Sequence, residues 1–175
     1  ENWKQSIVEF NRSILLGSNK SDTYYFSGLA WIKQGNYLEA IPLLRRAVSM
    51  GPHKAHYHFD LGNAYLHEKF FDKALLEFRQ TLQIQPKYPQ AHNNIGVIFW
   101  NLEAYEQAEV EFKKALDIKH DLPGTHHNLA VLYLKNNHYA DAVFQLKQTL
   151  KLQPKNPITK ELLDYALRQL KEDPS

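Results

Sequence analysis

The chain has 175 residues, a length that suits one compact domain or one short solenoid. Its 21 Lys and Arg residues nearly balance its 19 Asp and Glu residues, and the formal net charge of +2 favours neither nucleic acid nor an anionic membrane as a partner. The absence of cysteine excludes disulfides, zinc–thiolate sites and a catalytic thiol.

A spacing of 34 residues recurs along the chain and defines the expected elements. Small residues keep this interval in two series, namely Gly28, Gly62, Gly96, Ala130 and Ala40, Ala74, Ala108, Ala142. An aromatic series, Tyr37, Phe71, Tyr105 and Tyr139, has the same interval. A fixed period of this length indicates stacked supersecondary units.

Residues 1–20 are expected to form one helix, because Trp3, Ile7 and Phe10 begin a series of apolar residues at helical spacing. Shifted by 34 residues, this segment matches the second half of a repeat. Two interpretations stay open. The segment is either the second helix of a repeat whose first helix precedes residue 1, or an N-terminal capping helix.

Four full repeats follow, at residues 21–54, 55–88, 89–122 and 123–156. Each has two amphipathic segments of roughly 13 residues, which predict a pair of helices. The turns between them are expected near Gly35, Lys69, Glu103 and Asn137. Gly35 and Asn137 suit a left-handed helix end, whereas Lys69 and Glu103 predict tighter or strained turns.

Proline residues support these helix limits. Pro52, Pro86 and Pro154 follow the second helices, because proline disfavours helical geometry in the residue before it. A second series, Pro89, Pro123 and Pro157, falls at the expected helix starts, where a missing N–H is harmless.

Residues 157–175 are expected to form a C-terminal capping helix and a frayed tail, the helix covering the open face of the last repeat. Leu163 and Leu167 keep the register of core positions in the preceding repeats. Asp164 stands where the other repeats carry Gly or Ala, so we expect it to face water.

Each repeat is expected to bring small residues of its two helices together, such as Gly62 with Ala74 and Gly96 with Ala108. Larger residues, such as Phe78 and Phe112, are expected to fill the surroundings. These residues resemble the tetratricopeptide repeat family, with L-G-x-x-Y seen as Leu61-Gly62…Tyr65 and A-x-x-x-F-x-x-A seen as Ala108, Phe112 and Ala115. The related 35-residue RNA-binding repeats fit less well, because the period here is 34 throughout.

This resemblance implies an all-α fold, a right-handed α-solenoid of helix–turn–helix repeats with a C-terminal capping helix. The first helix of each repeat would build a concave wall. The resemblance also implies protein or peptide binding in that groove, with no catalysis and no cofactor.

Helical geometry places repeat positions two, five, six, nine, twelve and thirteen on one side of each first helix. From this side we predict the peptide-binding residues Tyr25, Phe26, Leu29, Phe59, Asn63, Asn93, Asn94, Val97, Trp100, His127, Asn128 and Val131. The N-terminal members are mainly aromatic and apolar, and the C-terminal members are rich in amides.

Asn94 and Asn128 occupy the same position in adjacent repeats, similar to the asparagine ladder of some family members that hold extended peptides. An amide side chain can both donate to and accept from a peptide backbone. The alternative is that the Asn residues cap neighbouring groups or face water. Trp100 either packs against the next repeat or stays partly exposed as a binding anchor, and we favour exposure.

Other sites are not expected. The places where some family members carry cations that grip a C-terminal carboxylate hold none here, which disfavours acidic chaperone tails as partners. His58, His92 and His126 share a packing position and predict structural roles rather than a metal site, while His127 is one of three groove-side His residues that would make binding pH-dependent. Glu103, Glu106, Glu109 and Glu111 are expected on solvated helix faces.

The sequence contains no apolar run near the roughly 20 residues of a membrane helix and no recognisable signal peptide. We therefore expect a soluble protein, with the cytoplasm favoured over the periplasm. The start at Glu1 rather than Met is expected of a segment from a longer protein.

The main hypothesis is a protein-interaction scaffold that binds an extended or helical partner segment in its concave groove. A second hypothesis is a targeting or regulatory module of a larger enzyme, such as a repeat-bearing glycosyltransferase. A third is a scaffold that self-assembles through the open ends of the array.

Overall fold

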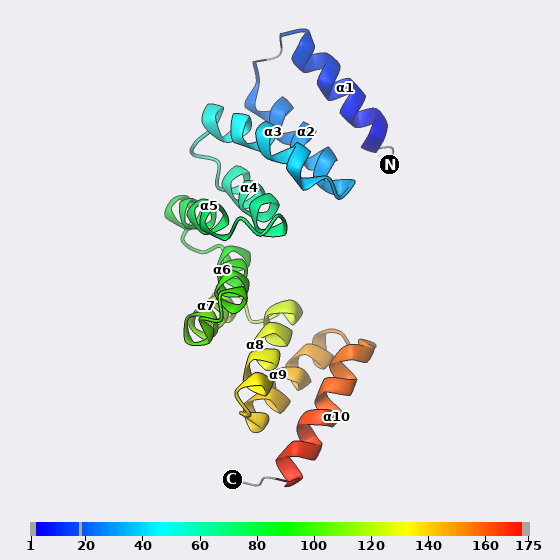
Figure 1. The fold of residues 1–175 in the computed structure, drawn as a ribbon, viewed down its shortest axis with the longest axis vertical. Helices are drawn as coiled ribbons and strands as arrows, with labels where there is room; N and C mark the ends of the chain where they lie inside the picture. Colours follow the sequence, from blue (N-terminus) through cyan, green and yellow to red (C-terminus); the bar gives the residue numbers. More distant parts are fainter. Residues whose placement is uncertain (1–2, 18, 173–175) are drawn as a thin grey trace. The chain divides into compact units, whose positions relative to one another are not determined.

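The computed structural model of the protein describes residues 3–17 and 19–172 (Figure 1). All regular structure in these residues is helical, with ten α-helices and no strand, which confirms the all-α class. None of these helices is both long and apolar enough to cross a membrane. The tail from Asp173 to Ser175, for which we predicted fraying, lies outside the described residues.

The chain forms two compact units, residues 1–87 and 88–175. The first contains the helices α1 (Trp3–Leu15), α2 (Ser21–Lys33), α3 (Tyr37–Met50), α4 (Ala55–His67) and α5 (Phe71–Ile84). Consecutive helices in this unit pack against each other, and α2 also contacts α4. The first helices of adjacent repeats are therefore neighbours, as stacking of repeats requires.

The second unit has the same arrangement. It contains α6 (Pro89–Asn101), α7 (Tyr105–Ile118), α8 (Pro123–Lys135), α9 (Tyr139–Leu152) and α10 (Pro157–Glu172). Consecutive helices again pack together, and α6 contacts α8. The predicted helix lengths are confirmed, since the repeats have first helices of 13 residues and second helices of 14. We propose the repeat limits given above, because each predicted range contains one such pair.

Proline residues mark the helix limits as predicted. Pro89, Pro123 and Pro157 are the first residues of α6, α8 and α10. Pro52, Pro86 and Pro154 each lie two residues beyond the end of a second helix. The missing N–H of a proline costs nothing in the first helical turn, so these residues fix the start of each first helix.

The four turns within the repeats share one backbone conformation. Gly35 has a φ of 80°, and Lys69, Glu103 and Asn137 have φ values of 59°, 58° and 60°. The turns at Lys69 and Glu103 are therefore not tighter than the other two, but a left-handed φ at a residue other than glycine agrees with the strained alternative that we predicted. These residues adopt the left-handed conformation that glycine takes more readily, because the backbone N–H after each of them bonds to a carbonyl at the helix end.

The glycine residues of the first helices face large residues rather than only the small residues that we paired with them. A Cβ atom at Gly62 would lie 2.7 Å from the ring of Phe78, and one at Gly96 would lie 2.6 Å from the ring of Phe112. The alanines Ala74 and Ala108 are nevertheless fully buried. Each glycine thus makes room for one large side chain of the second helix, and this close contact positions the helix pair.

A third face of the first helices is buried, which the two-sided helix model missed. This face consists of repeat positions three and ten, which we assigned neither to the groove side nor to the packing side. Its members include Tyr57 at position three and Ala64, Ile98 and Leu132 at position ten, and all four are buried. Leu132 of α8 joins a core cluster with Phe112 and Leu116 of α7. Leu132 thus binds the repeat at 123–156 to the repeat at 89–122, and Tyr57 stacks on Tyr25 of the repeat before it.

Helix α10 covers the end of the second unit, as predicted. Its Ala166 is fully buried in a cluster with Ala130 and Leu146, and Leu163 and Leu167 pack against that cluster. Asp164 is exposed, which confirms that the position carrying Gly or Ala in other repeats faces water here.

Candidate functional site

Five of the predicted peptide-binding residues line one pocket in the second unit. The pocket has a volume of about 190 Å³. Its lining consists of Val97 and Trp100 from α6, Phe112 from α7, and His127, Asn128 and Val131 from α8. Because α6 and α8 are equivalent helices of adjacent repeats, equivalent positions such as Val97 and Val131 both face the pocket.

Local packing fixes the shape of this pocket. The absence of a side chain at Gly96 lets the ring of Phe112 lie against α6, and that ring is the contribution of α7 to the lining. Phe112 is 1% exposed and sits in the core cluster, so it is a fixed wall. A pocket with such a wall is largely formed before any ligand arrives.

Trp100 both packs against the next repeat and lines the pocket. Its side chain is partly buried against the cluster that includes Leu132 and Tyr133. The ring also meets Tyr105 edge-on, with ring centroids 5.3 Å apart. The two interpretations of Trp100 from the sequence are therefore compatible. Part of the side chain is held by the protein, and part of it lines the pocket.

His127 is a half-buried imidazole in this lining. Burial lowers the pKa of His127, because desolvation disfavours its charged form. The side chain is thus neutral at neutral pH. None of the five other lining residues is ionisable, so the pocket carries no charge.

An amide network beside the pocket joins α6 to α8. The Oδ1 atom of Asn93 accepts hydrogen bonds from Asn128 Nδ2 at 3.1 Å and from the Thr125 hydroxyl at 3.0 Å. Asn93 Nδ2 donates to Asn94 Oδ1 at 3.0 Å. Asn93 therefore agrees with the alternative interpretation, in which these Asn residues form hydrogen bonds with neighbouring groups of the protein. Thr125 was missed, since it occupies the third face and is 3% exposed.

The predicted residues of the first unit are less open. Tyr25 is only 8% exposed, because its ring stacks on Tyr57 at 4.4 Å and its hydroxyl donates to Asp60 Oδ2 at 2.6 Å. Phe26 is 49% exposed and stacks on Phe10. The remaining residues, Leu29, Phe59 and Asn63, are half-buried. Tyr25 thus holds two repeats together, and only Phe26 presents a large apolar surface.

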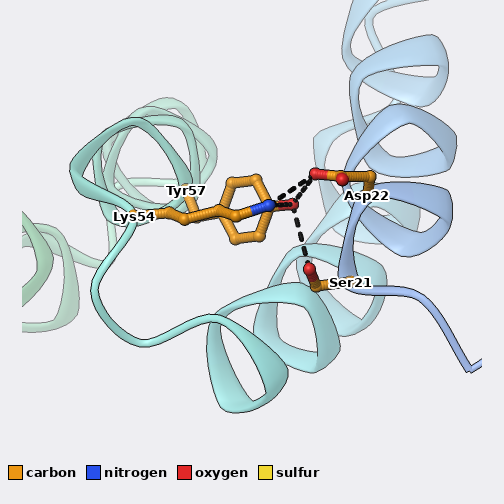
Figure 2. Close-up of polar contacts among 4 residues, drawn as sticks. All are labelled: Ser21, Asp22, Lys54 and Tyr57. Carbon is orange, nitrogen blue, oxygen red and sulfur yellow. Dashed lines mark hydrogen bonds and ion pairs between the residues drawn. The ribbon is translucent and has the colours of Figure 1, made fainter.

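A polar cluster at the start of α2 also serves the fold (Figure 2). Lys54 Nζ donates to Asp22 Oδ1 at 2.7 Å and to the Tyr57 hydroxyl oxygen at 2.9 Å. Tyr57 in turn donates to Asp22, and the Ser21 hydroxyl lies 3.3 Å from Tyr57. Hydrogen bonds from Lys54 and then Tyr57 hold the pKa of Asp22 below its usual value. The carboxylate of Asp22 and the ammonium group of Lys54 thus pair with each other, so this cluster contributes to the fold.

The predicted structural role of the three packing histidines is confirmed. The Nδ1 atoms of His58, His92 and His126 lie 2.6–2.7 Å from side-chain oxygens of Glu77, Glu111 and Gln145, each 19 residues further along the chain. No group of three or more potential metal ligands occurs within residues 3–17 and 19–172.

Two of the four glutamates expected on solvated faces have structural contacts instead. Burial would raise the pKa of Glu111, but hydrogen bonds from His92 and Lys114 outweigh it and lower that pKa. Glu109 accepts a hydrogen bond from the Tyr133 hydroxyl at 3.0 Å. Only Glu103 and Glu106 are exposed as expected.

A second pocket, of about 480 Å³, lies between α7 and α9 and contains none of the predicted residues. It is lined by both charged and apolar groups, among them Lys113, Asp117 and the 58% exposed Phe144. It was not predicted from the sequence, because the residues of the second helices were expected only to pack within the repeats.

Solved structures with the same architecture include MamA, with a TM-score of 0.80, 18% identity, and coverage of 88% of this chain and 90% of the other. TTC0263, a thermophilic TPR protein in Thermus thermophilus, gives a TM-score of 0.75 at 21% identity, covering 94% and 90%. YrrB, a TPR protein with an unusual peptide-binding site, gives 0.74 at 17% identity, covering 95% and 84%. No curated protein is significantly similar in sequence.

Three family models match the chain, and each describes a tetratricopeptide repeat. They match residues 28–89, 89–121 and 123–156, which together make up most of the sequence. Repeats of this family form protein-interaction scaffolds and are typically non-catalytic. The helix pairs, the 34-residue period and these three matches show that the chain belongs to the tetratricopeptide repeat family.

Proposed function

We propose that the protein binds a segment of a partner protein along α6 and α8, with the pocket between these helices as its main anchoring point. The observation that carries this proposal is the pocket itself. Five residues predicted from their repeat positions meet in one concave, uncharged site of about 190 Å³. Concave sites with mostly apolar walls and a few polar groups are the usual form of ligand pockets.

The polar groups beside the pocket support a peptide as the ligand. Asn128 lines the pocket and gives one hydrogen bond to Asn93 through its Nδ2 atom. Within the described part of the chain, its Oδ1 atom has no hydrogen-bond donor. An amide oxygen placed in this way can accept a hydrogen bond from a backbone N–H. The similar protein YrrB is described as having a peptide-binding site, which supports peptide binding on this architecture.

Selection of peptides from a random displayed library, followed by calorimetry, tests the proposal. We expect Trp100→Ala to lower the affinity of the protein for the selected peptides by at least about tenfold, because an aromatic anchor in a concave site dominates binding. Asn128→Ala should lower this affinity by a smaller factor, because it removes one hydrogen bond to the peptide backbone.

Phe144→Ala is the matched control, since it removes an exposed aromatic side chain from the pocket between α7 and α9. It should leave the affinity unchanged. If Phe144→Ala weakens the peptides and Trp100→Ala does not, the segment binds the second helices and the proposal is wrong.

A further inference from the structure

We infer that the pocket between α6 and α8 takes one aromatic side chain of the bound segment, with the phenol of tyrosine preferred over a phenyl ring. The inference rests on the proposed function and specifies which residue of the partner enters the pocket. Size, charge and the free polar groups of the lining each support it.

The size of the pocket corresponds to one ring. A dry cavity of about 150 Å³ lined by apolar side chains holds one benzene molecule. The volume here is about 190 Å³, which leaves space for one added hydroxyl group. A smaller side chain would cover less of the apolar wall, and the uncovered part would stay in contact with water.

The lining excludes charged side chains. No carboxylate faces the pocket to pair with Lys or Arg, and no cation faces it to pair with Asp or Glu. His127 is neutral because of its burial. A charged ligand group would lose its water without gaining a partner.

The rings of Trp100 and Phe112 line the pocket, so an aromatic ligand can make ring–ring contacts there that an aliphatic side chain cannot make. The imidazole of His127 supplies a polar contact. None of the described residues forms a hydrogen bond with its ring nitrogens. A neutral imidazole offers one donor and one acceptor, so it can bond to a phenol hydroxyl. This contact is the reason to prefer tyrosine.

The test uses small probes, each representing one residue of a peptide: N-acetyl-tyrosinamide, N-acetyl-phenylalaninamide, N-acetyl-leucinamide and N-acetyl-lysinamide. Binding is followed by the NMR shift of the Trp100 indole N–H, which Trp100→Phe assigns among the three tryptophans of the chain. We expect the tyrosine probe to bind several-fold more tightly than the phenylalanine probe, the leucine probe more weakly still, and the lysine probe not at all.

Two variants test the location of the site. His127→Phe should remove the preference for tyrosine while the phenylalanine probe still binds. Val131→Trp should fill the pocket and abolish binding of all probes. Val110→Trp is the control, because Val110 is half-exposed on α7 and does not line the pocket. Circular dichroism of each variant shows whether the helices are retained.

The inference is overturned if the lysine and tyrosine probes shift Trp100 equally, or if a folded Val131→Trp protein still binds them. Peptide selection distinguishes failure of this inference from failure of the proposed function. Library peptides that depend on Trp100 but contain no aromatic residue would retain the binding surface and refute the aromatic ligand. Failure to select any peptide that depends on Trp100 would refute both.

Discussion

The Nδ1 atom of His58 lies 2.6 Å from a carboxylate oxygen of Glu77, and both side chains are largely buried between α4 and α5. The opposite ring nitrogen lies 3.0 Å from the carbonyl oxygen of Pro52. Each of these groups accepts a hydrogen bond, so the doubly protonated ring is the form that fits the site best. The hydrogen bond to Glu77 accordingly raises the pKa of His58.

This shift predicts how stability changes with pH. A raised pKa means that the folded protein binds the His58 proton more tightly than the unfolded chain does. The contribution of the pair is complete below the unfolded pKa of about 6.5, and it is lost as the pH rises through the pKa of folded His58. The free energy of unfolding, measured in urea at several pH values, should therefore decrease through this window.

Glu77→Gln is the comparison variant, because it recreates the neutral partner that His126 has in Gln145. The decrease should be smaller in that variant. His127, whose pKa is lowered, acts in the opposite direction, and its contribution cancels when the two proteins are compared at each pH. Equal pH dependence in both proteins would contradict the prediction.

Glycine at the left-handed turns should stabilise the protein. Lys69 and Glu103 have φ values of 59° and 58°, where their Cβ atoms are crowded. We expect Lys69→Gly and Glu103→Gly each to raise the free energy of unfolding by about 0.5–1 kcal/mol in urea denaturation. The reverse change, Gly35→Ala, should lower it by about 1 kcal/mol. A loss of stability in both glycine variants would show that the turns are not strained.

Alanine should have opposite effects at two glycines of the second unit. At Gly96 the new methyl group would lie 2.6 Å from the ring of Phe112, so Gly96→Ala should cost about 1–3 kcal/mol in unfolding free energy. Among the described residues, no atom outside the adjoining stretch of α8 and its neighbours lies within 4 Å of a Cβ placed at Gly124, so Gly124→Ala in the first turn of α8 should stabilise by about 0.4–1 kcal/mol. Both values follow from thermal or urea unfolding, and a similar effect at the two positions would refute the proposed packing.

Asp60→Asn should stabilise the first unit at neutral pH. Burial raises the pKa of Asp60, although hydrogen bonds from Tyr25 and Asn63 act against it. Because the folded state binds this proton more tightly than the unfolded state, stability falls as the pH rises from the ordinary value of 3.8 through the folded pKa.

An asparagine at position 60 keeps an oxygen that can accept from Tyr25 and carries no charge to desolvate, at the cost of the 3.4 Å bond from Asn63, whose acceptor oxygen is replaced by an NH2 group. In the variant, the free energy of unfolding should no longer fall as the pH rises through this acidic range. The variant should also unfold at a higher temperature than the original protein at pH 7. A lower unfolding temperature at pH 7 would show that the carboxylate bonds outweigh the cost of burial.

The sequence predicted the helices well, because proline, small residues and the 34-residue period all specify the same elements. It did not predict that Tyr25 would be covered. A helix wheel places Tyr25 on the groove side, but it cannot show the ring of Tyr57 stacking on it from the next repeat. The same limit applies to Thr125, whose bond to Asn93 depends on how two repeats align. Contacts within a repeat follow from its own pattern, whereas contacts between repeats depend on their relative position.

The left-handed turns were predicted only where the residue type favours them. Glycine at position 35 made a left-handed turn predictable, and the same geometry at Lys69 was not expected from its residue type. Three flanking backbone bonds per turn hold the conformation, including one from Phe70 N–H to Tyr65 O at 2.9 Å. The left-handed turn is therefore held by the same backbone hydrogen bonds whichever residue occupies it, and the residue type adjusts its energy.

The two kinds of polar contact have different consequences for how such an array can change during evolution. His58 and Glu77 belong to one helix pair, so duplication of that pair copies their side-chain contact. Asn93 and Asn128 belong to neighbouring pairs, so a repeat inserted between them would separate donor from acceptor. The histidine contacts can therefore be inherited one repeat at a time, whereas the amide network constrains which repeat follows which.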